Sequence, residues 1–322
     1  MKAKMQLART VEEAAGFCPS VLTIGKFDGV HSGHAWLLRQ VIALARERNL
    51  RPSALTFDPH PACVVAPERA PRPLIPLEER CERIQELGIE QLFVLHFTAE
   101  IARLTPEEFV ERFVHGVMQA RIVLVGENFR FGYKQAGDPV VLRKLGERFG
   151  FEVRVVEPVR RRGRIVSTSE IRRLIEAGLV SKACRLLGRP YALSGDIVHG
   201  FGIGAKQTVP TLNLRPPAEA LPGKGVYISR TDDLTGGRHW DSITNVGIRP
   251  TFGGGELSIE TYLLDPLEGP APSAIRVQFL KRVREERKFE NPEALKRQIL
   301  SDVARAQEYF RRRARLVSSE VT

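Results

Sequence analysis

The stretch VLTIGKFDGVHSGH (21–34) holds the first strand, loop and helix start of the chain, and its pattern predicts the fold of the first half. Its apolar run VLTIG (21–25) has the composition of a buried strand, and apolar residues at helical spacing follow it directly over 33–48. The same order of strand and helix recurs up to about residue 178. Later strands are expected at 53–57, 91–97, 121–126 and 151–158, and later helices at 77–87, from 105, at 140–149 and at 167–178. Apolar strands that alternate with helices predict an α/β Rossmann-like parallel sheet covered on both faces.

The pattern changes after LLGRPY (186–191). From there, six strand-like segments follow one another, separated by turns rich in Gly and Pro. This arrangement predicts an antiparallel β-barrel or sandwich. A last helix begins at Asn291 and Pro292, a typical N-cap and first helical position, and carries an apolar stripe. We therefore expect two domains, 1–187 and 188–322.

The composition indicates an ordinary globular protein with a basic balance. The 322 residues include 49 Lys and Arg against 38 Asp and Glu, a formal net charge of +11, and 43% are hydrophobic. A disordered chain would hold fewer apolar residues, and no apolar run approaches the roughly 18 residues of a membrane span. The charge leaves open nucleic acid, an anionic membrane surface, or small anionic substrates such as nucleotides.

The N-terminus and the cysteines indicate a cytoplasmic protein. Residues 1–16 lack the apolar segment of a secretory signal peptide. The cysteines are widely spaced and form no CxxC pair, which argues against a zinc site or a disulfide framework. They are Cys18, Cys63, Cys81 and Cys184. We expect free thiols in a reducing compartment.

The loop GKFDGVHSGH (25–34) joins a strand to a helix and has the chemistry of a phosphate site. A helix start offers unpaired N–H groups and the positive end of the helix dipole. Gly29 and Gly33 let the backbone approach a ligand, and His31 and His34 can point to the same side. A lone histidine is usually a surface or core residue, but the H-x-G-H spacing at this place favours binding of phosphoryl oxygens. The H-E-x-x-H register of a metalloprotease does not match this stretch.

A second candidate site begins in HGFGIGAKQTVPTLNL (199–214). Its loop glycines are Gly200, Gly202 and Gly204. Such a loop can cradle phosphates, although barrels also use glycine at turns and bulges. Thr211 and Asn213 alternate along a strand and so face one side, where a hydroxyl and an amide oxygen can hold Mg²⁺ beside ATP.

Several motifs together resemble one enzyme family. H-S-G-H is similar to the HxGH motif of the nucleotidylyltransferase superfamily. In their order, the motifs resemble the adenylyltransferase module of bacterial bifunctional riboflavin kinase/FAD synthetases. They are GKFDGVHSGH (25–34), LTFDPHP (55–61), VGENFRFG (125–132) and VSTSEIRRLIEAG (166–178). The resemblance continues through LLGRPYALSGDIVHG (186–200) into the second half and covers nearly the whole chain.

The resemblance implies that the first domain is a nucleotidylyltransferase that transfers AMP from ATP to FMN and releases pyrophosphate. It implies that His31 and His34 bind the ATP phosphates and that Arg172 contacts phosphate. The surrounding ATP and flavin site would comprise Gly25, Phe27, Asp28, Gly33, Asn128, Asp138, Ser167 and Thr168, with Asn128 and Asp138 near flavin or metal. The basic run at 160–164 either is solvated or attracts the anionic substrates.

The second domain resembles the riboflavin kinases, which phosphorylate riboflavin to FMN with ATP. Residues 210–213, Pro-Thr-Leu-Asn, are similar to their PTAN motif, so Thr211 and Asn213 would assist Mg-ATP binding, with the glycine loop and Lys206 nearby. Glu260 in IETYLLD (259–265) would act as the base, because the riboflavin hydroxyl must lose a proton. Without the resemblance, an exposed strand carboxylate is the preferred interpretation of Glu260.

The chain departs from this family mainly in the kinase half. Ala205 and Thr208 stand where the family usually has Arg-x-x-Gly, Leu212 replaces the alanine of PTAN, and Pro266 stands where an aromatic is common. The preferred hypothesis is a two-step enzyme acting on the small molecules riboflavin, FMN and ATP with Mg²⁺, and neither nucleic acid nor membrane is an expected partner. A second hypothesis keeps the transferase and makes the barrel a weak or inactive kinase. A third, a nucleic-acid-binding protein, rests on the charge and on RRRAR (311–315).

Overall fold

The computed structural model describes residues 4–319 except 162, 199–210, 252–253 and 288. The chain divides into two compact units, 1–168 and 169–322. Each unit has its own six-stranded sheet and its own hydrophobic core. The division falls just ahead of the helix pair that precedes position 188, so the domain boundary expected there stays a prediction.

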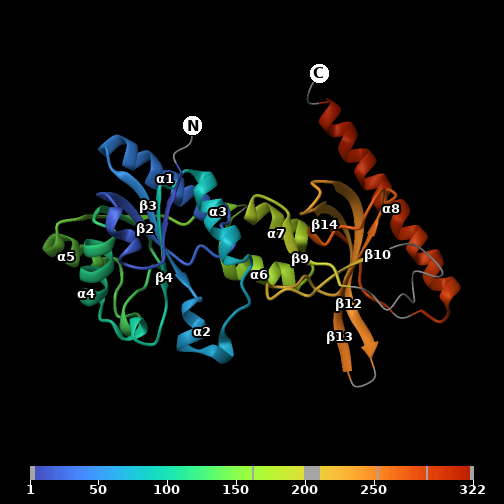
Figure 1. Cartoon of the computed structure of the whole chain (residues 1–322), viewed down its shortest axis with the longest axis horizontal. Helices are drawn as coiled ribbons and strands as arrows, with labels where there is room; N and C mark the ends of the chain where they lie inside the picture. Colours follow the sequence, from blue (N-terminus) through green and yellow to red (C-terminus); the bar gives the residue numbers. More distant parts are fainter. Residues whose placement is uncertain (1–3, 162, 199–210, 252–253, 288, 320–322) are drawn as a thin grey trace. The chain divides into compact units, whose positions relative to one another are not determined.

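The first unit is built on a parallel sheet with the strand order β1-β4-β3-β2-β5-β6 (Figure 1). Its strands are β1 (Gln6–Ala8), β2 (Ser20–Ile24), β3 (Arg51–Asp58), β4 (Gln91–His96), β5 (Ala120–Gly126) and β6 (Glu152–Val156). The expected Rossmann-like α/β fold is confirmed. The edge strand β1 was not expected, because three residues carry too little pattern to identify a strand.

Helices cover both faces of this sheet (Figure 1). They are α1 (Ser32–Arg48), α3 (Leu77–Leu87), α4 (Pro106–Phe109), the π-helical η4 (Val110–Val117) and α5 (Pro139–Phe149). The short helix α2 (Pro61–Val65) contributes no buried residue. Short 3₁₀ turns are η1 (Glu13–Gly16), η2 (Pro67–Arg69), η3 (Ile101–Arg103) and η5 (Tyr133–Gln135). Alternate strand residues face opposite sides, so Val21 packs with α1 and α3 while Leu22 packs with α4, η4 and α5.

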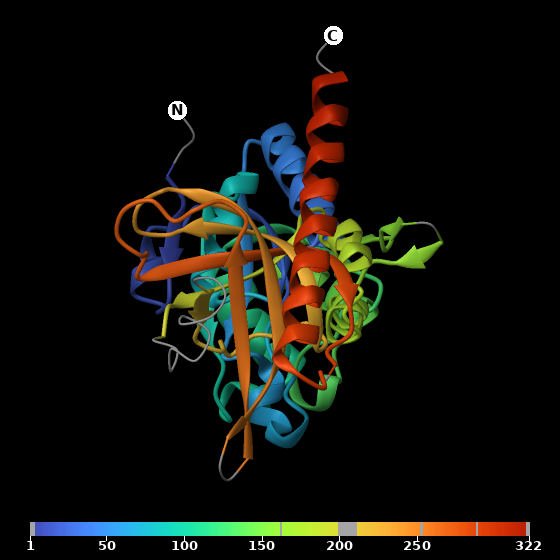
Figure 2. The ribbon, with the colours of Figure 1, turned by 90° about the vertical axis from the view of Figure 1, so that its right-hand side faces the viewer.

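The second unit is an antiparallel sheet with the order β10-β13-β12-β11-β14-β9. Its strands are β9 (Tyr191–Asp196), β10 (Thr211–Leu214), β11 (Gly225–Asp233), β12 (His239–Thr251), β13 (Gly254–Leu263) and β14 (Ala274–Arg284). A bridge between Ile197 and Leu214 joins the two sheet edges, so the sheet closes as a barrel rather than forming a sandwich. Figure 2 shows the long β12–β13 hairpin.

Helices flank this barrel. They are α6 (Thr168–Glu176), α7 (Val180–Leu187) and the long α8 (Pro292–Ser319). Helix α8 buries Ala306 and Phe310 against Val226, Ile228 and Ile243 of β11 and β12 (Figure 2). The expected C-terminal helix is therefore confirmed, and the Asn291 side chain accepts the Ala294 N–H at 2.8 Å, as its N-cap position predicts.

Two helix ends in the first unit have well-defined local caps. Thr105 and Glu108 form a reciprocal capping box, and Gly88 ends α3 in a left-handed conformation with φ 107°. The basic run contributes to an exposed two-stranded ribbon, β7 (Arg160–Arg161) with β8 (Arg164–Ile165). Within the described residues, the search for a helix long and apolar enough to cross a membrane finds none.

Candidate active sites

The loop between β2 and α1 turns sharply at the carboxyl edge of the parallel sheet. Its Gly25 N–H donates to the Leu55 carbonyl of the neighbouring strand at 3.0 Å. Phe27 and Val30 adopt positive φ angles of 48° and 35°, and Gly29 has φ 80°. Positive φ angles are strained for residues other than glycine, so the surrounding contacts must stabilise Phe27 and Val30 in this conformation. The loop thereby delivers His31 to the first turn of α1.

His31 is the N-cap of α1. Its Nδ1 accepts the N–H of His34 at 3.2 Å, so in the neutral ring the proton lies on Nε2, which is then a donor. The two imidazoles stack with centroids 3.6 Å apart and planes 12° from parallel. A Cβ at Gly33 would lie 3.1 Å from the Cε1 of His31, so only glycine leaves the ring its full space. The expectation that the two histidines share one side is confirmed.

His34 is held in the neutral form. Burial, reinforced by the nearby His31, keeps its pKa well below the ordinary value of 6.5. Phe27 meets the ring edge-on with centroids 5.3 Å apart, and within the described residues the buried Nδ1 has no hydrogen-bond partner. The pair therefore offers imidazole groups, rather than two positive charges, at a helix start.

The loop is tied to the segment that carries the fourth motif. The Asp28 carboxylate accepts the N–H of Leu74 at 2.7 Å, and the Asp28 carbonyl accepts the Thr168 hydroxyl at 3.2 Å. Asp28 is buried, and Ser167 is half-buried beside Thr168. Two motifs that are far apart in the sequence, one with Asp28 and His31 and the other with Ser167 and Thr168, therefore lie in one structural unit.

Other residues expected at this site have different surroundings. Asn128 is exposed just after β5. Asp138 is the N-cap of α5: its carboxylate accepts the N–H groups of Val140 at 2.8 Å and Val141 at 2.9 Å, and these bonds lower its pKa. That structural task explains Asp138 without a ligand. Arg172 lies on α6 in the second unit, one helical turn after Thr168, and is half-buried.

The second candidate site is a row of side chains across three strands. Asn213 on β10 lies directly opposite Glu260 on β13, and Glu260 lies opposite Asn245 on β12. Thr211 is two residues before Asn213, so it shares that face. Directly opposed residues place their Cβ atoms about 4.5–5.5 Å apart. The register therefore brings together the side chains of Thr211, Asn213 and Glu260, which the sequence analysis proposes. It also adds Asn245, which the sequence analysis does not name.

Buried hydroxyls on the opposite face of β12 and β13, and on the neighbouring β11, support this register. Thr244 lies within 2.8 Å of Ser229 and 2.9 Å of Thr261, and Ser229 lies 2.8 Å from Ser242. All are fully buried inside the barrel. Each hydroxyl needs a partner there, so a slip of one residue would leave several unsatisfied.

The donor set of this row fits a magnesium ion only with help from a nucleotide. The described residues contain no group of three or more His, Cys, Asp or Glu that could hold a metal. Thr211 and Asn213 offer oxygen atoms, the ligands that Mg²⁺ prefers. A protein-bound Mg²⁺ usually completes its coordination shell with phosphate oxygens and water. The glycine loop, with Gly200, Gly202, Gly204 and Lys206, lies outside the described residues.

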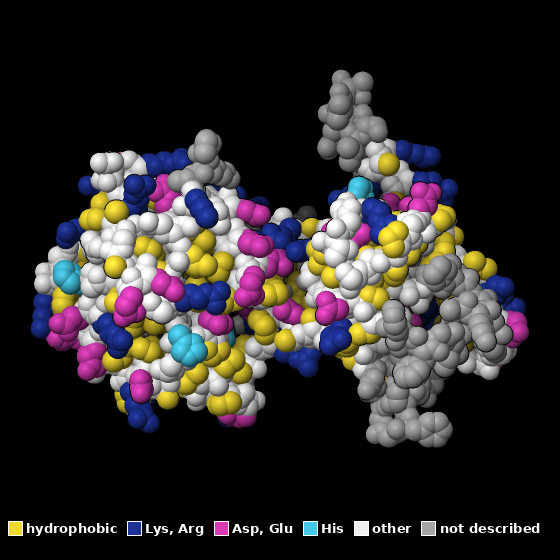
Figure 3. Space-filling model, in the orientation of Figure 1, with side chains coloured by type: hydrophobic (Ala, Val, Ile, Leu, Met, Phe, Trp, Pro, Cys, Tyr) yellow, Lys and Arg dark blue, Asp and Glu magenta, His cyan; other side chains and the backbone are white. Residues whose placement is uncertain are grey.

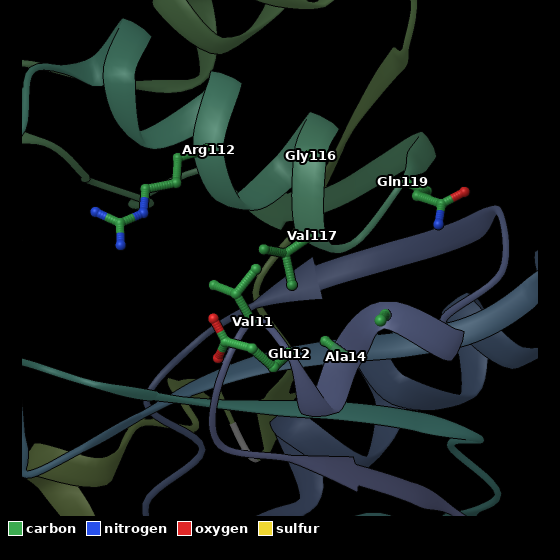
Figure 4. Close-up of a pocket in the computed structure, with 8 residues that line it drawn as sticks. Val11, Glu12, Ala14, Arg112, Gly116, Val117 and Gln119 are labelled. Atoms are coloured by element: carbon green, nitrogen blue, oxygen red, sulfur yellow. The ribbon is translucent and has the colours of Figure 1, made fainter.

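A shallow hollow lies at the opposite edge of the parallel sheet (Figure 4). It is lined by residues that precede β2 and β5, including Glu12, Arg112 and Gln119. Val11 and Val117 point toward each other within it (Figure 4). Ligands of parallel sheets bind beyond the carboxyl ends of the strands, and this hollow contains none of the expected site residues.

A parallel α/β unit with stacked histidines at a helix start, joined to a closed barrel with a Thr/Asn/Glu row, defines a two-site nucleotide-handling protein. Comparison with known proteins gives the particular family. The FAD synthetase family model matches residues 15–170, and the riboflavin kinase family model matches 187–310. The chain belongs to the bifunctional riboflavin kinase/FMN adenylyltransferase family.

Similar proteins span nearly the whole chain. The bifunctional riboflavin kinase/FMN adenylyltransferase of Escherichia coli (strain K12) is 33% identical over 290 residues, which cover 90% of this chain and 92% of that protein. The protein of that name from Bacillus subtilis (strain 168) is 32% identical, also covering 90% and 92%. A solved structure titled as a macrolide-efflux protein from Streptococcus pneumoniae has a TM-score of 0.84 at 27% identity, covering 95% of this chain and 99% of that one.

Proposed function

We infer that the chain makes FAD from riboflavin in two ATP-dependent steps. The order of the two matched families places FMN adenylyltransferase in the first unit and riboflavin kinase in the barrel. The observation that carries the first activity is the stacked His31–His34 pair at the start of α1. The row of Asn213, Glu260 and Asn245 supports the second. We also propose domains at 1–187 and 188–322.

In the adenylyl transfer, a phosphate oxygen of FMN attacks the α-phosphorus of ATP, and the bond to the β-phosphate breaks. The attacking group is already an anion, so no base is required, and the protein's task is to position and stabilise charge. We propose that His31, through Nε2–H, and His34 donate to phosphate oxygens. Arg172 would contact phosphate, and Ser167 and Thr168 would support the helix start that carries it.

In the kinase step, the riboflavin 5′-hydroxyl attacks the γ-phosphorus of ATP, and ADP leaves. This hydroxyl is neutral, so a base must accept its proton, and we propose that Glu260 does so. Thr211 and Asn213 would hold Mg²⁺ beside the ATP oxygens, where the ion neutralises phosphate charge. One departure from the family pattern is harmless to this row, because Leu212 is buried on the interior face of the barrel.

The assay is a flavin separation after incubation of the purified protein with riboflavin, Mg²⁺ and ATP. FMN and FAD are the expected products, and the absence of both would refute the proposal. His34→Ala should lose FAD formation and keep FMN formation. Glu260→Ala should lose FMN formation and still convert supplied FMN to FAD. If either change abolished both steps in a folded protein, the assignment of two separate sites would be wrong.

An inactive or weak kinase is the second candidate function. It is motivated by Ala205 and Thr208, which stand at family positions outside the described residues. A protein that converts FMN to FAD but leaves riboflavin unchanged would select it.

The basic charge does not favour nucleic acid as a partner. Arg311 and Arg312 of the C-terminal run both form ion pairs with Glu308, at 3.3 and 2.6 Å. Figure 3 shows basic and acidic side chains intermixed over the face that it displays. We propose ATP, riboflavin and FMN as the partners, and a cytoplasmic location supported by the four free cysteines.

A further inference from the structure

One buried arginine joins the end of β3 to the start of the histidine loop, which follows β2. Arg80 lies on α3, and the residue is only 9% exposed. Its Nη1 donates to the Lys26 carbonyl at 2.8 Å and to the Phe57 carbonyl at 3.1 Å, and lies 3.3 Å from the Thr56 hydroxyl. Thr56 in turn donates to the Lys26 carbonyl at 3.1 Å. A single guanidinium therefore holds the end of β3 to the first residues after β2.

The packing of α3 does not require a charged group at this position. The neighbouring buried positions of the helix are Cys81 and Ile84, which pack in the apolar core against the sheet. Burial of a guanidinium is costly, and here it lowers the pKa of Arg80, while the carboxylates of Asp28 and Asp58 act in the opposite direction. Arg80 Nε is also buried without a hydrogen-bond partner in the described part of the chain. What the charged side chain adds at this position is its set of bonds to the Lys26 and Phe57 carbonyls.

The shortest of these bonds is to the carbonyl of Lys26, which lies at the start of the histidine loop. Lys26 lies between the end of β2 and Phe27, the first strained residue of the loop. Farther along, Asp28 is held by Leu74 and Thr168. Arg80 therefore supplies the anchor at the strand end of a loop whose other end is the N-cap His31.

We propose that Arg80 is a positioning residue for the adenylyl transfer, which keeps the loop 25–31 where His31 and His34 meet the phosphates. The inference rests on the proposed function of the first unit. A displacement of about 1 Å in a catalytic group can reduce a rate about a hundred-fold. Loss of the Arg80 anchor should therefore reduce kcat for FAD formation, with a smaller effect on the KM for ATP.

The test compares Arg80→Met and Arg80→Lys with Arg83→Met in the full chain. Arg83 is a matched control, because it lies on the same helix and pairs with Glu79 at 2.7 Å without bonding to either strand end. We expect Arg80→Met to reduce kcat for FAD formation about a hundred-fold, and Arg80→Lys to recover part of it, because lysine keeps the charge but not the planar fork. Arg83→Met should keep the parent rate. FMN formation from riboflavin serves as an internal reference in every variant.

The measurements separate positioning from a structural role. A structural role would lower the thermal unfolding midpoint but leave kcat per folded molecule unchanged at temperatures well below it. If Arg80→Met does not fold, the folded Arg80→Lys protein decides the question. A kcat for FAD formation within about two-fold of the parent in the folded variant, or an equal loss in Arg83→Met, would overturn the inference. If the parent itself forms no FAD, the proposed function fails instead.

Discussion

Replacement of Gly33 by alanine should separate catalysis from stability in the first unit. The added Cβ would lie 3.1 Å from Cε1 and 3.2 Å from Nδ1 of His31, closer than ordinary van der Waals contact. The imidazole must therefore move by a few tenths of an ångström or rotate. Either movement weakens the 3.2 Å hydrogen bond from the His34 N–H to Nδ1 and disturbs the stacked pair.

The two effects on stability nearly cancel. Loss of an N-cap hydrogen bond costs about 0.5–2 kcal/mol, and glycine to alanine in a helix gains about 1 kcal/mol. The free energy of unfolding should thus change by no more than about 1 kcal/mol. The rate of FAD formation should fall about 10–100-fold, because the displaced ring no longer meets the phosphate in the productive geometry.

The assay measures kcat for FAD formation from supplied FMN, together with chemical unfolding of the same preparation. Gly16→Ala is the control, because Gly16 is exposed and a Cβ there would meet no atom within 4 Å. FMN formation should be unchanged in both variants. A Gly33→Ala protein that forms FAD at the parent rate would show that the position of the His31 ring does not matter, and the proposed role of the pair would be wrong.

Three further predictions concern pH, the barrel interior and the metal. In the folded chain the pKa of His34 lies well below 6.5, so below that pH the unfolded chain binds a proton that the folded chain does not. The free energy of unfolding should therefore fall from pH 7 to 5, by at most about 1.4 kcal/mol per pH unit. In a denaturation series, His34→Gln should flatten this decline. Thr244→Val should destabilise the protein by about 1–3 kcal/mol in urea unfolding, because Ser229 and Thr261 lose a buried partner; an unchanged midpoint would contradict this. Chelation of Mg²⁺ should stop both reactions and leave the thermal midpoint unchanged, since Thr211 and Asn213 are too few ligands to hold the ion without ATP; a lowered midpoint would indicate a resident structural metal.

Features that depend on near neighbours in the chain could be predicted from the sequence. His31 and His34 are three residues apart at a helix start, and this spacing alone brings their rings to one side. The cap at Asn291 and the capping box at Thr105 depend on the same short range. Asp138 carries an equally local signal, because Asp followed by Pro before a helical pattern is typical of an N-cap.

Features that depend on strand pairing or burial could not be predicted in the same way. Asn245 became part of the second site only because β12 pairs with β13 in a register that places it opposite Glu260. Arg80 lies in LEERCERIQEL, where an arginine on an amphipathic helix is expected to reach solvent. Whether such a side chain is exposed or buried depends on which strand ends meet the helix, and these are distant in the sequence.

Periodicity, caps and motifs are local properties of the chain, so the α/β and barrel classes and the family could be predicted from the amino-acid sequence. The contacts that hold the histidine loop, in contrast, become visible only in the folded chain. Its anchors come from Arg80, Thr56, Leu74 and Thr168, which lie on separate segments and meet the loop only after the sheet has formed. Burial then sets the chemistry, since a desolvated imidazole stays neutral and a desolvated guanidinium must find carbonyl partners.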